Sequence, residues 1–334
     1  MLRILEQGSI EKHYSWKDVV NRILDTFNLY ERNVYKCFMK EMNIPIIGWL
    51  IAAIWTKINK FILHKVYFNY VEVPITTKCS LRCKECANLI QYYQNGEFFD
   101  YKKIINDIHK LSQVSERIEM LRILGGEPLL HPDLKNIIEE ILKNKNIRNI
   151  QIVTNGTMIF NENIIRVLKN KRVSVDISNY KDISRNYKEL IGQLRKHKIR
   201  FTTQDTFEWT EQGDFIYQGL SQKNLERALK ICNLDCISLL DGSMHLCPRS
   251  SHGNDLNIFK SDEQDYVNIR KSRIKKQLKR ELFELLNKKS IVACNFCKAY
   301  MQDCLKPCVA GEQIGRAEAI AHYNEMLRVN GGKR

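Results

Sequence analysis

The stretch YVEVPITTKCSLRCKEC, from Tyr70 to Cys86, joins a predicted strand to three closely spaced cysteines. Cys79, Cys83 and Cys86 follow the spacing C-x3-C-x2-C. A structural zinc site normally has four protein ligands and a disulfide pairs two thiols, so three thiols complete neither arrangement. Three thiolates on a metal cluster would leave one metal position open. The stretch therefore predicts a catalytic metal centre at the end of a strand, with a zinc site completed from elsewhere in the chain as the alternative.

Strands and helices alternate from this stretch to about Gln204. Apolar patterns predict strands in the segments IEMLRIL, IRNIQIVT, RVSVDIS and IRFTTQ, each preceded by an amphipathic helical pattern. Such alternation is typical of parallel βα units with right-handed crossovers. Functional groups of parallel sheets lie at the carboxyl ends of the strands. We therefore expect the cysteines, the GGEP turn at 125–128 and the TNG turn at 154–156 to lie on one rim of the sheet.

The rest of the chain lies on either side of this unit. We predict three domains in the 334 residues: a helical N-terminal extension over 1–67, an α/β unit over 68–207 and a cysteine-rich region over 208–334. The last region contains Cys232, Cys236, Cys247, Cys294, Cys297, Cys304 and Cys308. The N-terminus, MLRILEQGSIEKHYSW, lacks the apolar core of a signal peptide, so we expect a cytoplasmic protein. In a reducing compartment, closely spaced cysteines favour metal ligands over disulfides or scattered structural thiols.

The formal net charge of +15 suggests an anionic partner, but the lysines are spread along helical segments, so solvated helix faces are the favoured explanation. Basic and aromatic residues are not interleaved as in single-strand binders, so no specific nucleic acid is expected. The uncharged, mostly apolar segment from Ile44 to Trp55 is too short to span a bilayer. Since Lys57 and Lys60 follow among further apolar residues, residues 44–63 are predicted either to contact a membrane surface or to pack on the main domain or a partner.

The cysteine spacing after the first strand, GGEP after the second and TNG after the third together resemble the radical S-adenosylmethionine (radical SAM) superfamily. The resemblance covers roughly residues 68–205 and implies an α/β fold, a partial (β/α)6 TIM-like barrel. It also implies that Cys79, Cys83 and Cys86 hold a [4Fe-4S] cluster whose open iron is chelated by S-adenosyl-L-methionine (SAM). Reductive cleavage of SAM would then give a 5′-deoxyadenosyl radical that abstracts a hydrogen atom from a substrate.

The resemblance also implies a set of SAM-binding residues: Gly125, Gly126, Glu127, Pro128, Asn155, Asp176 and Ser178. The two glycines would let the backbone approach the ligand, and Glu127 would accept a hydrogen bond from the methionine amine. No catalytic residue is predicted beyond the cluster. The chain departs from the family at Glu85, where an aromatic residue usually precedes the third cysteine, so side-chain packing on adenine is in doubt.

The cysteine-rich region resembles the auxiliary-cluster extensions of the superfamily, called SPASM and Twitch. The G-x4-C element from Gly242 to Cys247 matches both. The predicted ligands of one auxiliary [4Fe-4S] cluster are Cys236, Cys247, Cys294 and Cys297. The alternatives are two clusters, with Cys232, Cys304 and Cys308 as further ligands, and a zinc ribbon.

The predicted function is modification of a substrate C–H bond, either in peptide maturation or in sugar oxidation or epimerisation. An electron donor such as flavodoxin or ferredoxin is the expected partner. The alternative is a non-catalytic iron–sulfur or zinc-binding scaffold on a degenerate barrel.

Overall fold

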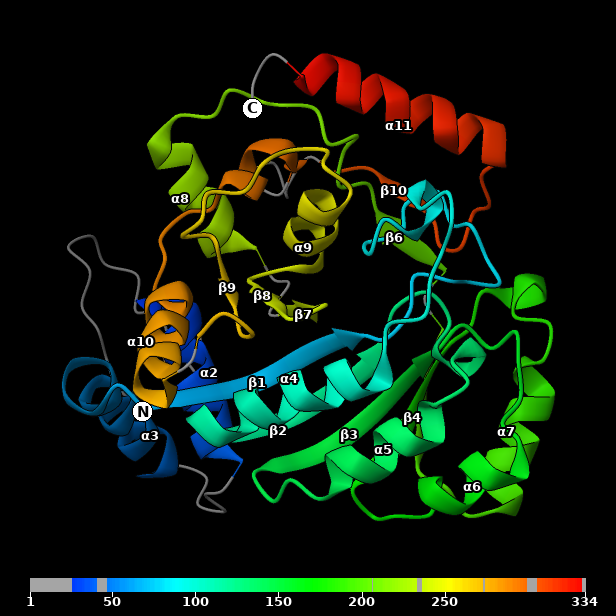
Figure 1. Cartoon of the computed structure of the whole chain (residues 1–334), viewed down its shortest axis with the longest axis horizontal. Helices are drawn as coiled ribbons and strands as arrows, with labels where there is room; N and C mark the ends of the chain where they lie inside the picture. Colours follow the sequence, from blue (N-terminus) through cyan, green and yellow to red (C-terminus); the bar gives the residue numbers. More distant parts are fainter. Residues whose placement is uncertain are drawn as a thin grey trace, which may run out of the picture.

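Figure 1 shows the computed structural model, which describes residues 26–40, 47–205, 207–232, 236–272, 274–298 and 305–331. Its main sheet has eight strands: β1 (Val66–Pro74), β2 (Ser115–Leu124), β3 (Ile147–Thr154), β4 (Val173–Ser178), β5 (Phe201–Gln204), β7 (Ile237–Leu240), β8 (Ser243–His245) and β9 (Tyr266–Asn268). They lie in the order β5-β4-β3-β2-β1-β7-β8-β9. β1 to β5 and β7 are parallel, whereas β8 and β9 are antiparallel to their neighbours.

The predicted α/β class with a parallel sheet is confirmed. The first five strands follow the predicted order, because each is joined to the next by a helix that crosses over the sheet. The sixth parallel strand is β7, which comes from the cysteine-rich region and pairs with β1. Central strands of parallel sheets are covered on both faces, which explains why four successive residues of β1, from Val71 to Pro74, are all buried.

Four helices cover one face of the sheet, as Figure 1 shows. They are α4 (Tyr101–Val114), α5 (Leu134–Leu142), α6 (Glu162–Leu168) and α7 (Tyr187–Lys196). The helix α5 buries Leu134, Ile137, Ile138 and Ile141, one stripe at helical spacing. Short 3-10 turns cover Ile90–Tyr92, Pro128–Leu130, Lys181–Ile183 and Val292–Phe296.

The described part of the N-terminal region is helical, as predicted. The helix α2 (Leu29–Met39) begins with a capping box between Asn28 and Glu31 and contacts β1. The helix α3 (Ile47–Ile58) continues as the π-helix η1 (Asn59–Leu63), which leads into β1. Within the described residues, no helix is both long and apolar enough to cross a membrane.

The C-terminal region contains α8 (Gln222–Ile231), α9 (Pro248–Asp255), α10 (Lys275–Leu286) and α11 (Arg316–Asn330). A two-stranded sheet pairs β6 (Glu208–Thr210) with β10 (Pro307–Val309). Side chains from all three predicted domains share one core. Since β7, β8 and β9 extend the main sheet, the C-terminal region packs as part of the same layer, and the domain boundaries stay predictions.

Candidate active site

The loop that carries the three cysteines begins where β1 ends, beside the turn that follows β2. The Gly126 N–H donates to the carbonyl oxygen of Thr76 at 2.8 Å, and the Glu127 N–H donates to that of Lys78 at 2.8 Å. These bonds continue the pairing of β1 with β2 beyond the strands. The cysteine loop is therefore held against the GGEP turn by backbone hydrogen bonds.

Gly125 and Gly126 are needed for this contact. Gly125 has a φ of +139°, and a Cβ atom there would lie 2.2 Å from the carbonyl oxygen of Thr76. A Cβ atom at Gly126 would lie 2.0 Å from the carbonyl oxygen of Lys78. The two glycines were predicted to admit a ligand, but the backbone they admit here is that of the cysteine loop.

The three cysteines line one cavity of about 400 Å³ at the carboxyl ends of the strands. Predicted SAM-binding residues that line it are Gly125, Gly126, Asn155 and Ser178. Glu85 also lines this cavity. The strand order places these residues together, because β1, β2, β3 and β4 are consecutive parallel neighbours. These residues lie together at one rim of the sheet, as predicted. What each residue binds stays a prediction.

The donor set fits an iron–sulfur cluster. Burial and, to a smaller extent, the neighbouring thiols among the three raise the pKa of the Cys79 and Cys83 thiols to about 12. Such thiols become thiolates readily only when a metal takes the charge. Within the described ranges, no group of three His, Cys, Asp or Glu side chains is arranged to hold a single metal ion. Three separate thiols around one cavity suit a cluster, whose thiolates bind different iron atoms.

The side chain of Glu127 does not line the cavity but lies behind its wall. Its carboxylate accepts hydrogen bonds from the Thr154 hydroxyl at 2.9 Å, the Asn155 N–H at 2.9 Å and the Leu129 N–H at 3.1 Å. Burial raises its pKa to about 7 despite these three donors. Glu127 therefore joins the turn after β2 to the turn after β3, and Pro128 begins the short 3-10 turn beside it.

A buried ion network forms the floor of the cavity. Arg122 on β2 donates to Glu72 on β1 at 3.1 Å and to Asp176 on β4 at 3.0 Å. Burial raises the pKa of Glu72, while Arg122 and the Cys236 thiol lower it. Asp176 was predicted to contact SAM, but it pairs with Arg122 and does not line the cavity. The available signal was the single charge in β1 and in β4, Glu72 and Asp176 respectively.

A C-terminal segment that contains Glu312 and Gln313 is hydrogen-bonded to the cysteine loop. The sequence analysis missed this contact. The Arg82 N–H donates to Gln313 Oε1 at 2.7 Å, and Gln313 Nε2 donates to the sulfur of Cys83 at 3.4 Å. The Lys84 N–H donates to the carbonyl oxygen of Glu312 at 2.8 Å. No spacing pattern connects residues this far apart in sequence, so only the tertiary structure reveals the contact.

A second group of cysteines lies apart from the first. The thiol of Cys294 interacts electrostatically with Cys247, Cys297 and Cys232, and burial raises its pKa. Burial raises the pKa of Cys247 to about 12, with Cys232 as the next cause. These four thiols come from the end of α8, the β8–α9 junction and the last 3-10 turn. The structure thus brings together four candidate ligands, one of which was predicted only as an extra ligand.

The remaining C-terminal cysteines are Cys236, Cys304 and Cys308. Cys236 lines the cavity that contains Cys79, Cys83 and Cys86. The charged neighbours of Cys308 are Glu85, Glu211 and Glu312, and burial raises its pKa. Cys304 lies outside the described residues.

Arg249 links the two cysteine groups electrostatically. Its cation lowers the pKa of both Cys86 and Cys247, against the larger effect of burial. The guanidinium lies over the Phe215 ring at 3.7 Å and donates to the carbonyl oxygen of Gly213 at 2.8 Å. Arg249 is 5% exposed, so it is placed to stabilise thiolates in both groups.

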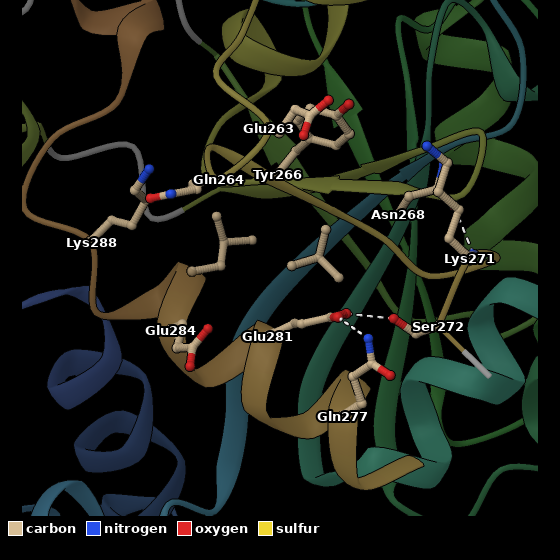
Figure 2. A pocket seen from close by; sticks show the side chains of 12 residues that line it. Glu263, Gln264, Tyr266, Asn268, Lys271, Ser272, Gln277, Glu281, Glu284 and Lys288 are labelled. Carbon is tan, nitrogen blue, oxygen red and sulfur yellow. Dashed lines mark hydrogen bonds between the residues drawn. The ribbon is translucent and has the colours of Figure 1, made fainter. Parts of the chain in front are cut away.

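A separate hollow of about 710 Å³ lies between β9 and α10 (Figure 2). Its polar side chains include Glu263, Glu281, Glu284 and Lys288, and Glu281 accepts hydrogen bonds from Ser272 and Gln277. No cysteine lines it. The hollow therefore offers no thiol for a cluster, and the candidate active site is the cavity at the strand ends.

Residues 73–204 match the family model described as the Radical SAM superfamily. The chain is 25% identical over 179 residues to the GTP 3′,8-cyclase of Clostridium perfringens (strain 13 / Type A), and the match covers 52% of this chain and 53% of that protein. The chain spans about half or less of the length of the curated relatives it matches.

Two solved structures are also similar to this chain. anSMEcpe with bound AdoMet and Cp18Cys peptide is 13% identical, with coverage of 79% of this chain and 97% of that chain and a TM-score of 0.41. BtrN in complex with AdoMet and 2-DOIA is 16% identical, with coverage of 70% and 93% and a TM-score of 0.42. Neither likeness is close enough to bear on the substrate of this chain. The match of residues 73–204 confirms the predicted resemblance to the radical SAM superfamily over that part of the chain.

Proposed function

We propose that this protein is a radical SAM enzyme that modifies a substrate C–H bond. The observation that carries the proposal is the single cavity lined by Cys79, Cys83 and Cys86 together with the Gly125–Gly126 turn. A [4Fe-4S] cluster held by these thiols would, with SAM on its open iron, supply a 5′-deoxyadenosyl radical for hydrogen abstraction. The chain's own contribution is to hold the thiols, exclude water and orient the substrate.

Asn155 supports this site in two ways. Its Nδ2 amide donates to Ser80 at 3.1 Å and lies 3.7 Å from the sulfur of Cys79. Hydrogen bonds to cluster sulfurs are one means by which proteins adjust a cluster's reduction potential. Its N–H donates to Glu127, which fixes the turn. We therefore assign Asn155 a positioning role beside the cluster as well as its predicted contact with SAM.

The charges of the cavity favour an uncharged or cationic polar substrate. Its charged lining residues are Glu72, Glu85 and Arg122, and Arg122 already pairs with two carboxylates. A nucleoside triphosphate is normally bound by several cationic side chains or a metal. We therefore favour a sugar or a peptide over the nucleotide named in the cyclase relatives. Gln204, Thr210 and Gln212 supply hydrogen-bonding groups that would suit sugar hydroxyls.

For the C-terminal region we propose one auxiliary [4Fe-4S] cluster on Cys232, Cys247, Cys294 and Cys297. Their mutual electrostatic interactions support this set. It replaces the predicted Cys236 by Cys232, because Cys236 lines the other cavity beside Glu72. The neighbours of Cys308 are carboxylates, which disfavours the two-cluster alternative.

The expected partners and location follow from this chemistry. Cleavage of SAM needs one electron, so an electron donor such as flavodoxin or ferredoxin stays part of the proposal. A cytoplasmic location, where such donors are found, also stays part of it. Peripheral membrane contact through residues 44–63 also stays a prediction; residues 44–46 lie outside the described residues.

The proposal is tested by measuring 5′-deoxyadenosine after anaerobic cluster reconstitution, with SAM and dithionite. The Cys79→Ala/Cys83→Ala/Cys86→Ala variant should form none. The control is Cys37→Ala, which removes a fully buried thiol of α2 that does not line the cavity. Iron-loaded wild-type protein that forms no 5′-deoxyadenosine, even with sugar and peptide substrates present, would support the non-catalytic iron–sulfur scaffold instead. Zinc as the bound metal would support the zinc-binding scaffold.

A further inference from the structure

The helix formed by α3 and η1 buries small and polar side chains and exposes large apolar ones, which is the opposite of a helix in a water-soluble domain. Its buried positions include Ala52, Thr56 and Asn59, which are spaced for one helical face and are all 0% exposed. Its exposed side chains include Leu50 at 51%, Ile54 at 53%, and Phe61 and Ile62 at 70% each. A helix in water normally buries its large apolar face, so this one presents an apolar ridge to its surroundings.

The exposed apolar side chains of the molecule concentrate on this ridge. Seven of the eleven large apolar side chains exposed among the described residues are Leu50, Ile51, Ile54, Phe61, Ile62, Leu63 and Ile274. Ile274 precedes α10 and lines a hollow of about 530 Å³ with Leu63 and His64. Ile274 is 62% exposed and lies at the N-cap of α10. The ridge therefore extends onto the start of α10.

Basic side chains surround the apolar ridge. They are Lys57, Lys60, Lys65, Lys275, Lys276, Lys279 and Arg280. Their acidic partners are fewer: Glu31 pairs with Lys57 and Lys60, Glu116 with Lys65 and Lys279, and Glu284 with Arg280. The surface thus combines an apolar centre with a cationic border, on a chain whose formal net charge is +15.

We propose that the α3–η1 ridge and the start of α10 bind the surface of an anionic phospholipid bilayer. The apolar side chains would enter the boundary between headgroups and acyl chains, and the basic border would contact lipid phosphates. A second copy of this chain fits the surface less well, because a symmetric dimer would place the two cationic borders against each other. The proposal is independent of the proposed catalytic function.

The orientation that follows leaves the active site in water. The ridge lies before the start of β1 at Val66, whereas the cysteine loop follows its end at Pro74. Nine residues of strand separate the two regions by roughly 30 Å. Figure 1 shows α3 near the start of β1 and the opposite end of the strand pointing away from it. A protein bound by the ridge would therefore hold its cavity away from the bilayer, open to an aqueous substrate and electron donor.

The test is sedimentation of the full-length, cluster-loaded protein with vesicles of phosphatidylcholine, with or without phosphatidylglycerol. We expect binding to the anionic vesicles and much weaker binding to the neutral ones. Ile54→Asp/Ile62→Asp should weaken binding at least about tenfold, since it places two charges in the apolar centre. Lys276→Gln/Arg280→Gln should weaken it by about tenfold or more, because it removes two border cations. The control is Val309→Asp on β10, where the valine is 63% exposed, and it should bind like the wild type.

Two results would overturn the proposal. The first is no binding of the wild type to anionic vesicles, or binding that Ile54→Asp/Ile62→Asp leaves unchanged. The second is a wild-type dimer in light scattering that the same double variant converts to a monomer, which would assign the ridge to a second copy. Thermal melting of each variant would show that the fold is retained, as expected for exposed positions.

Discussion

Replacing Arg122 by methionine should destabilise the protein strongly, because it leaves two carboxylates without their cation. The side chains of Arg122, Glu72 and Asp176 are only 15%, 9% and 4% exposed. Removing one partner from a buried ion network typically costs about 3–5 kcal/mol, since the remaining charges are left uncompensated. Asp176 keeps hydrogen bonds from Thr202 at 2.7 Å and Gln204 at 2.7 Å, so the larger part of the cost should come from Glu72.

The assay is urea unfolding of cluster-free wild type and variant across a range of pH. Burial already raises the pKa of Glu72, and losing Arg122 should raise it further. A carboxyl whose pKa is higher in the folded state contributes stability below its unfolded pKa and loses that stability as pH rises through the folded pKa. The destabilisation should therefore shrink as pH falls and the Glu72 carboxyl becomes protonated.

The matched control is Arg280→Met on the exposed side of α10, where the arginine only pairs with Glu284 at 3.7 Å. It should change the free energy of unfolding by less than about 0.5 kcal/mol. The triple variant Glu72→Gln/Arg122→Met/Asp176→Asn should recover much of the lost stability, because no buried charge remains. A loss below about 1 kcal/mol for Arg122→Met, or a loss that does not depend on pH, would refute the inference that the network is buried and charged.

Three further predictions concern the cysteine groups and the turns around them. Cys232→Ala should lower the iron content by one cluster and remove one electron paramagnetic resonance signal. Cys236→Ala should leave both the iron content and the signal unchanged. The opposite result would restore Cys236 as the ligand. Gly126→Ala should prevent cluster assembly on the first three cysteines, because its Cβ atom would lie 2.0 Å from the Lys78 carbonyl oxygen. The iron content of the protein measures this assembly. The control is Gly192→Ala, which has no atom within 4 Å of its Cβ and should assemble the cluster normally. The pKa of Glu127 is raised to about 7 by burial, so the stability it contributes should be present below its unfolded value near 4.5 and be lost as pH rises through about 7. Glu127→Gln should remove this part of the pH dependence in urea unfolding, and an unchanged slope would contradict the burial of that carboxyl.

Local patterns in the sequence determined much of this protein. The apolar periodicities predicted the strands and helices from β1 to β5, because a strand buried on both faces and a helix buried on one face have different spacings. The cysteine spacing and the GGEP turn predicted that these residues lie together at one edge of the sheet, since the ends of parallel strands meet there, and they line one cavity in the structure. The glycines at 125 and 126 were predicted to bind SAM, which stays a prediction; the structure gives them a backbone contact with the cysteine loop.

Only the tertiary structure decided which distant residues meet. The pairing of β7 with β1 brings Cys236, from the cysteine-rich region, to the cavity that Cys79, Cys83 and Cys86 line. Two further contacts join segments that no local pattern relates. One is the hydrogen bond from Gln313 to Cys83, and the other is the pairing of Arg122 with Glu72 and Asp176. The same holds for the apolar ridge: its composition is visible in the sequence, but the face that packs inward depends on α2 and β1. Long-range contacts depend on the summed packing of the whole chain, and a local period does not encode them.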